Sequence, residues 1–196
     1  LFSSVIFFYK HKFSLKLLVN FKKSNQIFTK QKINMNGFLG DTVFNEIYKQ
    51  KTFYDLNTLE GLSKYINNCD CALDIGAKIG NNSIFFSKFI SNFVIAIENS
   101  KKLYKILNQN LKLNLMQNQF IALNVDLKPK RYLTNYDPIK ISEKNIKNDL
   151  KENLFNTIDN LIANSKLKRT VDLISVSVEG MGLSILTEAN NTINKY

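Results

Sequence analysis

The chain has 196 residues, of which 27 are Lys or Arg and 16 are Asp or Glu, so its formal net charge is +11. This length fits one domain, and a hydrophobic fraction of 44% with seven Gly and two Pro excludes a disordered or collagen-like chain. No uninterrupted apolar run approaches the ~18 residues of a membrane span. Cys69 and Cys71 lie too close in sequence for a disulfide framework, which favours a reducing compartment. We therefore expect a soluble, cytoplasmic protein without a membrane span.

Almost all of the positive charge comes from lysine, because Arg131 and Arg169 are the only arginines. Lysine together with abundant Asn, Ile and Phe is typical of a protein encoded by an AT-rich genome. The positive net charge is therefore not by itself evidence for a function. Arginine, whose planar fork suits bases and phosphates, is nearly absent. We therefore expect solvated lysines on exposed helix faces and do not expect nucleic acid as a partner.

The hydrophobic pattern divides the chain near residue 50. Residues 1–50 are basic and of mixed periodicity, which predicts an N-terminal extension built from a hairpin or short helices. Beyond them, apolar runs typical of strands occur at 71–76, 93–98, 120–125 and 171–178, and helical spacing occurs at 56–66, 79–89, 103–111 and 154–162. A polar stretch at 127–152 carries both prolines and indicates an insertion or loop. Residues 51–196 thus predict an α/β fold with a doubly wound parallel sheet.

The first predicted strand ends in a glycine turn that includes Gly76 and Gly80. Glu98 ends the next strand, 22 residues after Gly76, where a carboxylate can accept hydrogen bonds from both hydroxyls of a ribose. The dinucleotide fingerprint needs Gly at the positions of Lys78 and Asn81, and no P-loop Gly-Lys-Ser/Thr closes the turn. The turn and the downstream acid together predict a nucleoside-containing cofactor, with a plain strand-to-helix turn as the alternative.

Other titratable residues are candidates of lower specificity. Asp74, two residues before Gly76, fits the acidic turn of S-adenosylmethionine-dependent methyltransferases, where it helps to hold the ammonium end of the cofactor. Asp126 follows the third strand and could meet the adenine amino group or be a solvated turn residue. His11 is the only histidine, so we expect no metal site and interpret the two cysteines as small buried residues.

Residues 54–196 resemble the FkbM family of S-adenosylmethionine-dependent methyltransferases. Five motifs carry the resemblance, in the same order as in the family. The first two are the glycine turn at 73–83 and the strand at 94–98 that ends in Glu. The third is a helix with Leu103, Asn108, Asn110, Leu113 and Asn114, the fourth is the segment 157–161, and the fifth is the strand at 171–174 with residues 178–180. The resemblance implies a Rossmann-like sheet, S-adenosyl-L-methionine as cofactor, and methyl transfer to a hydroxyl of a small molecule or saccharide. Together with the position of Asp126 after the third strand, it gives Asp74, Gly76, Ala77, Lys78, Gly80, Asn81, Glu98 and Asp126 as the expected cofactor-binding residues, although Lys78 stands where the family usually has Asn.

The chain departs from this family at the fourth strand. Ser175 and Ser177 stand where the family usually has Lys and Asp, and a serine cannot act as a carboxylate base. Glu179 is therefore the remaining acidic residue of the active face that we expect to be catalytic, with a structural Glu at a helix N-terminus as the alternative. A truncated or degenerate member without catalysis is the competing hypothesis. A nucleic-acid methyltransferase is a weaker one, because neither the Asn-Pro-Pro-aromatic tetrad nor a Pro-Cys pair occurs.

The ends of the chain suggest a fragment. It begins with Leu1, and it stops one helix after the fourth predicted strand, where the family would begin a fifth. We therefore expect a sheet that is incomplete at the C-terminus, with the fourth strand as an exposed edge that favours association. The methyl acceptor and the oligomeric state do not follow from the sequence.

Overall fold

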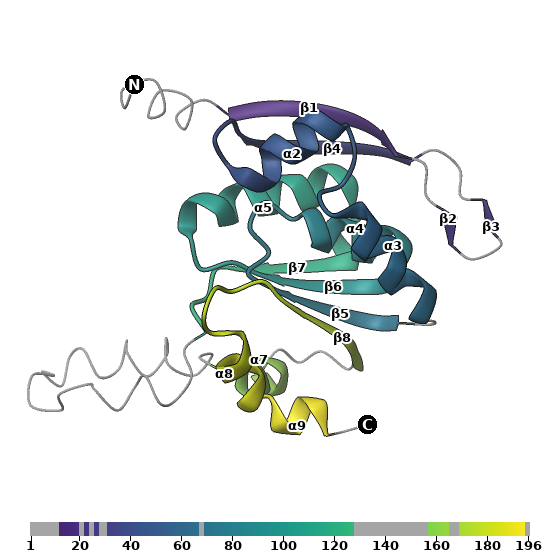
Figure 1. Ribbon diagram of the computed structural model, residues 1–196. Helices are drawn as coiled ribbons and strands as arrows, with labels where there is room; N and C mark the ends of the chain where they lie inside the picture. The colour runs from purple at the N-terminus through teal and green to yellow at the C-terminus, as the bar shows by residue number, and fades with distance from the viewer. Residues whose placement is uncertain are drawn as a thin grey trace, which may run out of the picture.

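The structure, a computed structural model, describes residues 12–19, 22–23, 26–27, 31–66, 69–127, 157–164 and 169–194. Its centre is a parallel sheet of β5 (Cys69–Ile75), β6 (Ser91–Ile97), β7 (Phe120–Leu123) and β8 (Val171–Val176). The spatial order is β7-β6-β5-β8 (Figure 1). In chain order this is 3-2-1-4, the arrangement of a doubly wound Rossmann-like sheet. The predicted α/β class is confirmed.

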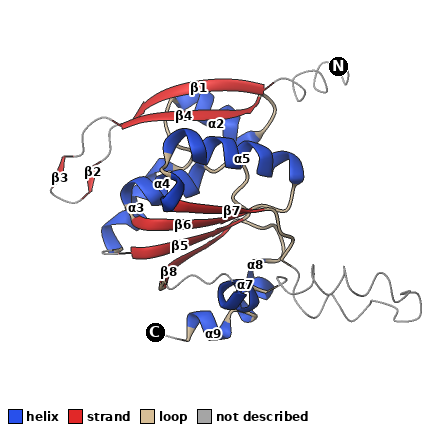
Figure 2. Ribbon diagram, turned by 180° about the vertical axis from the view of Figure 1, so that it is seen from behind, coloured by secondary structure: helices blue, strands red, loops and turns tan. Residues whose placement is uncertain are grey.

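The two central strands are buried because both faces of the sheet are covered. Helices α3 (Leu56–Tyr65), α4 (Asn81–Phe89) and α5 (Lys101–Asn114) lie on one side (Figure 2), and the short helix η1 (Gln117–Gln119) leads into β7. Helices α7 (Ile158–Asn164), α8 (Gly182–Thr187) and α9 (Asn190–Ile193) lie on the other. Side chains of β5 alternate between the two cores, as Ala72 joins the α3–α5 side and Leu73 the α7–α9 side. This explains the continuous apolar runs in the sequence.

A third layer lies over α5 and is formed by the antiparallel pair β1 (Lys12–Val19) and β4 (Gln31–Phe38) with α2 (Thr42–Gln50) (Figure 1). The short strands β2 (Lys22–Lys23) and β3 (Gln26–Ile27) pair with each other beside this layer. The side-chain amide of Asn110 on α5 accepts from the backbone N–H of Asn36 at 2.8 Å and donates to its carbonyl at 2.9 Å. Asn114 holds the backbone of Asn34 in the same way, at 2.8 and 2.7 Å. The free edge of β4 is thus paired by helix side chains, and a domain division at residue 50 stays a prediction.

The remaining expectations concern the edge of the sheet and the insertion. β8 pairs with β5 and, within the described ranges, with no further strand. The expected loop at 127–152, except for Leu127, and the start of the helix predicted at 154–162 lie outside the described residues. None of the helices described is both long enough and apolar enough to cross a membrane.

Candidate functional site

The glycine turn after β5 has two positions, Gly76 and Gly80, where a side chain would clash with its surroundings. Gly76 has φ +75°, and a Cβ there would lie 2.6 Å from the carbonyl oxygen of Ser177 at the end of β8. Gly80 has φ +93°, and a Cβ there would lie 2.9 Å from the Leu107 side chain on α5. Both glycines therefore allow a close approach that a side chain would prevent. Lys78 between them also has a positive φ, of 50°.

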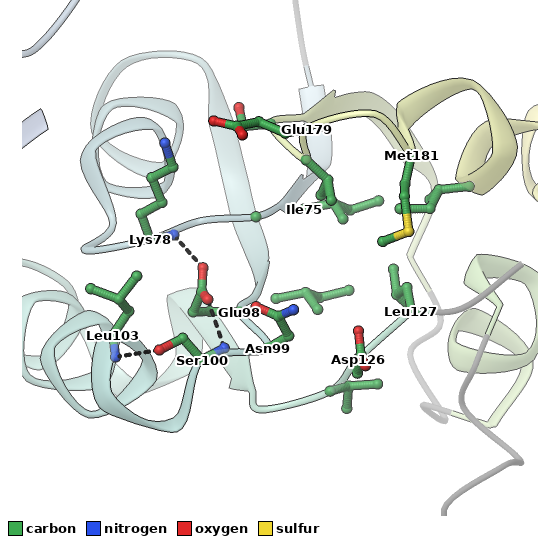
Figure 3. Close-up of a pocket in the computed structure, with 16 residues that line it drawn as sticks. Ile75, Lys78, Glu98, Asn99, Ser100, Leu103, Asp126, Leu127, Glu179 and Met181 are labelled. Carbon is green, nitrogen blue, oxygen red and sulfur yellow. Dashed lines mark hydrogen bonds between the residues drawn. The ribbon is translucent and has the colours of Figure 1, made fainter. Parts of the chain in front are cut away.

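Glu98 lies directly after β6 and is almost completely buried, at 4% exposure. One carboxylate oxygen accepts a 2.8 Å hydrogen bond from the backbone N–H of Lys78, and the other accepts one of 2.8 Å from the backbone N–H of Ser100 (Figure 3). These bonds fix the carboxylate between the glycine turn and the start of α5. Each oxygen keeps a further lone pair for a ligand hydroxyl.

A cavity of about 370 Å³ opens at the carboxyl ends of the four parallel strands, beside Glu98 (Figure 3). We call it the first cavity, and its lining residues are Ile75, Gly76, Lys78, Ile97, Glu98, Asn99, Ser100, Leu103, Val125, Asp126, Leu127, Ser177, Val178, Glu179, Met181 and Ile185. Its volume is within the range of small-molecule sites, and its position is where doubly wound sheets bind ligands.

The first cavity is acidic although the chain as a whole is basic. Its described lining carries three carboxylates, on Glu98, Asp126 and Glu179, and one ammonium group, on Lys78. Phosphate groups need several positive charges or donors, whereas this lining disfavours a polyanion. A nucleoside that carries positive charge fits this cavity better than a nucleotide with phosphates.

Five of the predicted site residues thus lie together in the first cavity, namely Gly76, Lys78, Glu98, Asp126 and Glu179. The other four predicted residues, Asp74, Ala77, Gly80 and Asn81, do not line it. Asn81 holds the backbone of Tyr54, accepting from its N–H at 2.9 Å and donating to its carbonyl at 3.1 Å. Gly80 precedes α4 and packs against α5, and Ala77 and Asn81 line a second cavity beside α3.

Asp74 is completely buried in β5 and points to α4. One carboxylate oxygen accepts a 2.5 Å hydrogen bond from the Ser83 hydroxyl, and the other accepts none from the described residues. Burial raises the pKa of Asp74 to about 6, against the opposing effect of the hydroxyls of Ser83 and Ser175. Asp74 therefore joins β5 to α4 through its hydrogen bond with Ser83, and it does not line the first cavity.

Glu179 lies in the turn between β8 and α8, and its side chain is exposed. The residue before α8 is Met181, so Glu179 stands two positions before the helix cap. Its carboxylate and that of Glu98 line the same cavity, which Ser177 also lines. Glu179 is therefore placed where a reacting group could reach it.

Sequence reasoning missed the polar and apolar residues that complete the lining. Ser100 caps α5, since its hydroxyl accepts from the N–H of Leu103 at 3.4 Å, and a serine directly before a helical period could have revealed it. Met181, Leu127 and Ile185 carry no motif, because an apolar side chain in a pocket looks like a core residue in sequence.

The described residues contain no group of three or more His, Cys, Asp or Glu side chains that could hold a metal ion. Cys69 and Cys71 are free and buried, and burial raises the pKa of the Cys71 thiol to about 12.

No family model matches this chain, and no curated protein matches it either. Solved structures are similar over part of it. TYW2 from P. horikoshii, in complex with MeSAdo, is 20% identical and the match covers 47% of this chain and 32% of that chain, with a TM-score of 0.37. TYW2 from M. jannaschii, in complex with AdoMet, is 18% identical over 58% of this chain and 54% of that chain, with a TM-score of 0.37. An rRNA methylase from Streptococcus thermophilus is 16% identical over 42% of this chain and 46% of that chain, with a TM-score of 0.31. The match therefore spans between 32% and 54% of the length of these solved chains.

Proposed function

We propose that this chain binds S-adenosyl-L-methionine and transfers its methyl group to a hydroxyl of a small molecule or saccharide, as its resemblance to the FkbM family implies. One observation carries the proposal. Glu98 is a buried, amide-bound carboxylate at the end of the second strand of a doubly wound sheet, and it lies beside a glycine turn in an acidic cavity. A ribose held there, on a molecule without phosphates, is the ligand that this chemistry favours.

The residues of the first cavity fit the parts of the cofactor. Glu98 would accept hydrogen bonds from the ribose hydroxyls, and Asp126 would accept one from the adenine amino group. Lys78 would pair with the carboxylate of the amino-acid part, and Gly76 leaves the backbone open to close approach. Apolar side chains such as Leu103 and Met181 supply the walls for the flat base.

Bound S-adenosylmethionine would supply a methyl group that its sulfonium already activates. The protein then has to hold the acceptor oxygen in line and to receive its proton. Glu179 is the candidate base, because its exposed carboxylate lines the first cavity. Ser177, two residues earlier, also lines it but cannot take a proton at neutral pH.

A binding protein without turnover is the second candidate function, and Ser177 is the observation that favours it. If the reaction needs a carboxylate at that position, the chain would bind the cofactor and leave it intact. This candidate and the first share the cofactor site and differ only in methyl transfer.

Calorimetry with ligands that share adenosine but differ in charge tests the proposal. We expect S-adenosylmethionine to bind, and ATP and NAD to bind at least tenfold more weakly, because phosphates would meet three carboxylates. Binding of ATP or NAD as tightly as S-adenosylmethionine would contradict the proposal. Nucleic-acid methylation would instead give an RNA gel shift that weakens steeply with salt.

A further inference from the structure

A second cavity of about 320 Å³ lies on the other side of the glycine turn. Its walls come from the start of α3, from α4, and from the face of β8 that carries Leu173 and Ser175. It opens beside helices that precede the sheet in the chain, and it does not include Glu98 or Asp126. This second cavity is therefore separate from the proposed nucleoside contacts.

The two cavities meet at three residues that line both, Gly76, Lys78 and Ser177. In the first cavity, Lys78 and Glu179 lie on one side and Asp126 lies on the other (Figure 3). A cofactor with its ribose on Glu98 and its adenine near Asp126 therefore directs its remaining part toward the shared residues. The second cavity therefore lies next to the expected position of the amino-acid end of the cofactor.

The second cavity has the mixed lining of a site for a hydroxylated molecule. Its polar lining includes Asp55, Thr58 and Asn82, and its apolar lining includes Leu62 and Phe86. Carboxylate and amide groups bind neighbouring hydroxyls in pairs, and apolar side chains suit the C–H face of a sugar ring. Lys78 and Asp55 balance each other in charge, so the described lining has no net charge to select an ionic ligand.

Asp55 lines this cavity, and its carboxylate does not cap the backbone of α3, the helix that it precedes. It stands before α3 in a left-handed conformation, with φ 52°, and makes no capping bond to the helix backbone. One of its carboxylate oxygens accepts a 2.9 Å hydrogen bond from the Thr58 hydroxyl. Because the Thr58 hydroxyl donates to Asp55, both side chains keep oxygen lone pairs that can accept hydrogen bonds from ligand hydroxyls at the wall of the second cavity.

We propose that the second cavity binds the methyl acceptor, and that the acceptor is a neutral, hydroxyl-rich molecule of about monosaccharide size. The proposal rests on the proposed function, and it adds the place and the chemical class of the acceptor. Asp55, Thr58 and Asn82 bind its hydroxyls, and the hydroxyl to be methylated lies toward Ser177 and the first cavity.

Saturation-transfer NMR with four methyl glycosides (gluco, galacto, manno and rhamno) tests this in the presence of S-adenosylhomocysteine. We expect at least one glycoside to bind wild type. Thr58→Trp, which fills the cavity from an exposed position, should abolish the signal, and Asp55→Asn, which tolerates the left-handed backbone, should weaken binding about tenfold. Lys64→Trp, an exposed change on the same helix outside the cavity, should leave it unchanged.

The possible results separate the two proposals. Loss of glycoside binding in Thr58→Trp with unchanged S-adenosylhomocysteine affinity supports the second cavity as the acceptor site. Glycoside binding that survives both changes in folded variants overturns it, and so does a wild type that binds S-adenosylhomocysteine but none of the four glycosides. A wild type that does not bind S-adenosylhomocysteine contradicts the proposed function itself.

Discussion

Asp74 on β5 and Ser175 on β8 are register partners across the parallel ladder, directly below the glycine turn. The Asp74 carboxylate is fully buried, and one of its oxygens accepts no hydrogen bond from the described residues. The Ser175 hydroxyl favours the charged form, but burial outweighs it and raises the pKa of Asp74 to about 6. The strand that leads into the turn therefore carries an acid whose ionisation destabilises the folded chain.

This acid predicts a pH-dependent stability. The pKa of Asp74 is raised from 3.8 to about 6 in the folded chain, so between those values the folded state holds a proton that the unfolded state has lost. The free energy of unfolding should then fall as pH rises from about 4 to about 6 and level off above, by at most roughly 3 kcal/mol. Urea unfolding of wild type and Asp74→Asn at several pH values measures it. The variant should lose this slope, and equal slopes in both proteins would show that Asp74 is not responsible.

Gly76→Ala should destabilise the chain. The added Cβ would lie 2.6 Å from the Ser177 carbonyl oxygen, and φ is +75°. The left-handed backbone alone costs roughly 1–2 kcal/mol, and the contact with backbone atoms adds to it. Gly61→Ala on α3 is the matched control, because its Cβ would meet nothing within 4 Å and alanine favours the helix by about 0.5–1 kcal/mol. Denaturant titration should therefore move the two midpoints in opposite directions, and a Gly76→Ala midpoint at or above that of wild type would refute the argument.

Ser177→Asp should raise methyl transfer if the rest of the site is intact. Ser177 lines both cavities, and a carboxylate at this position could take the proton of the acceptor hydroxyl. We expect this to raise the rate of methyl transfer by about tenfold or more. Transfer of tritium from labelled S-adenosylmethionine to a glycoside measures it. Thr187→Asp on α8 adds the same charge away from both cavities and should change nothing. An active wild type whose rate Ser177→Asp leaves unchanged would show that this position is not part of the chemistry.

The sheet could be predicted from sequence because buried parallel strands are apolar along most of their length, as 71–76 is except for Asp74 and 93–98 is up to Glu98. The ends of the strands were less predictable. Glu98 and Ser177 fall in predicted strands but lie beyond β6 and β8 in the structure. Their N–H groups still bond to the neighbouring strands, at 3.0 Å from Glu98 to Leu123 and 2.8 Å from Ser177 to Ile75, but both residues already line the first cavity. An apolar sequence pattern does not show where a strand ends and a cavity begins.

Contacts between distant segments could not be predicted. Asn110 belongs to a recognised motif, but its bonds to the backbone of Asn36 join residues 74 positions apart. Such a contact depends on where β4 lies on α5, and only the folded chain determines that. The second cavity could not be predicted for the same reason, since Asp55 and Ser175 line one cavity only once the chain has folded.

Cofactor binding by Glu98 is the central claim, and calorimetry with S-adenosylhomocysteine on Glu98→Ala and Glu98→Gln tests it most directly. Both variants lose hydrogen bonds between a buried charge and the ribose, worth roughly 1–3 kcal/mol, so affinity should fall by about tenfold to a hundredfold. Glu60→Ala on α3, which lines neither cavity, should bind as wild type does. Thermal melting confirms that the variants are folded. Unchanged affinity in a folded Glu98 variant would contradict the account and remove Glu98 from the site.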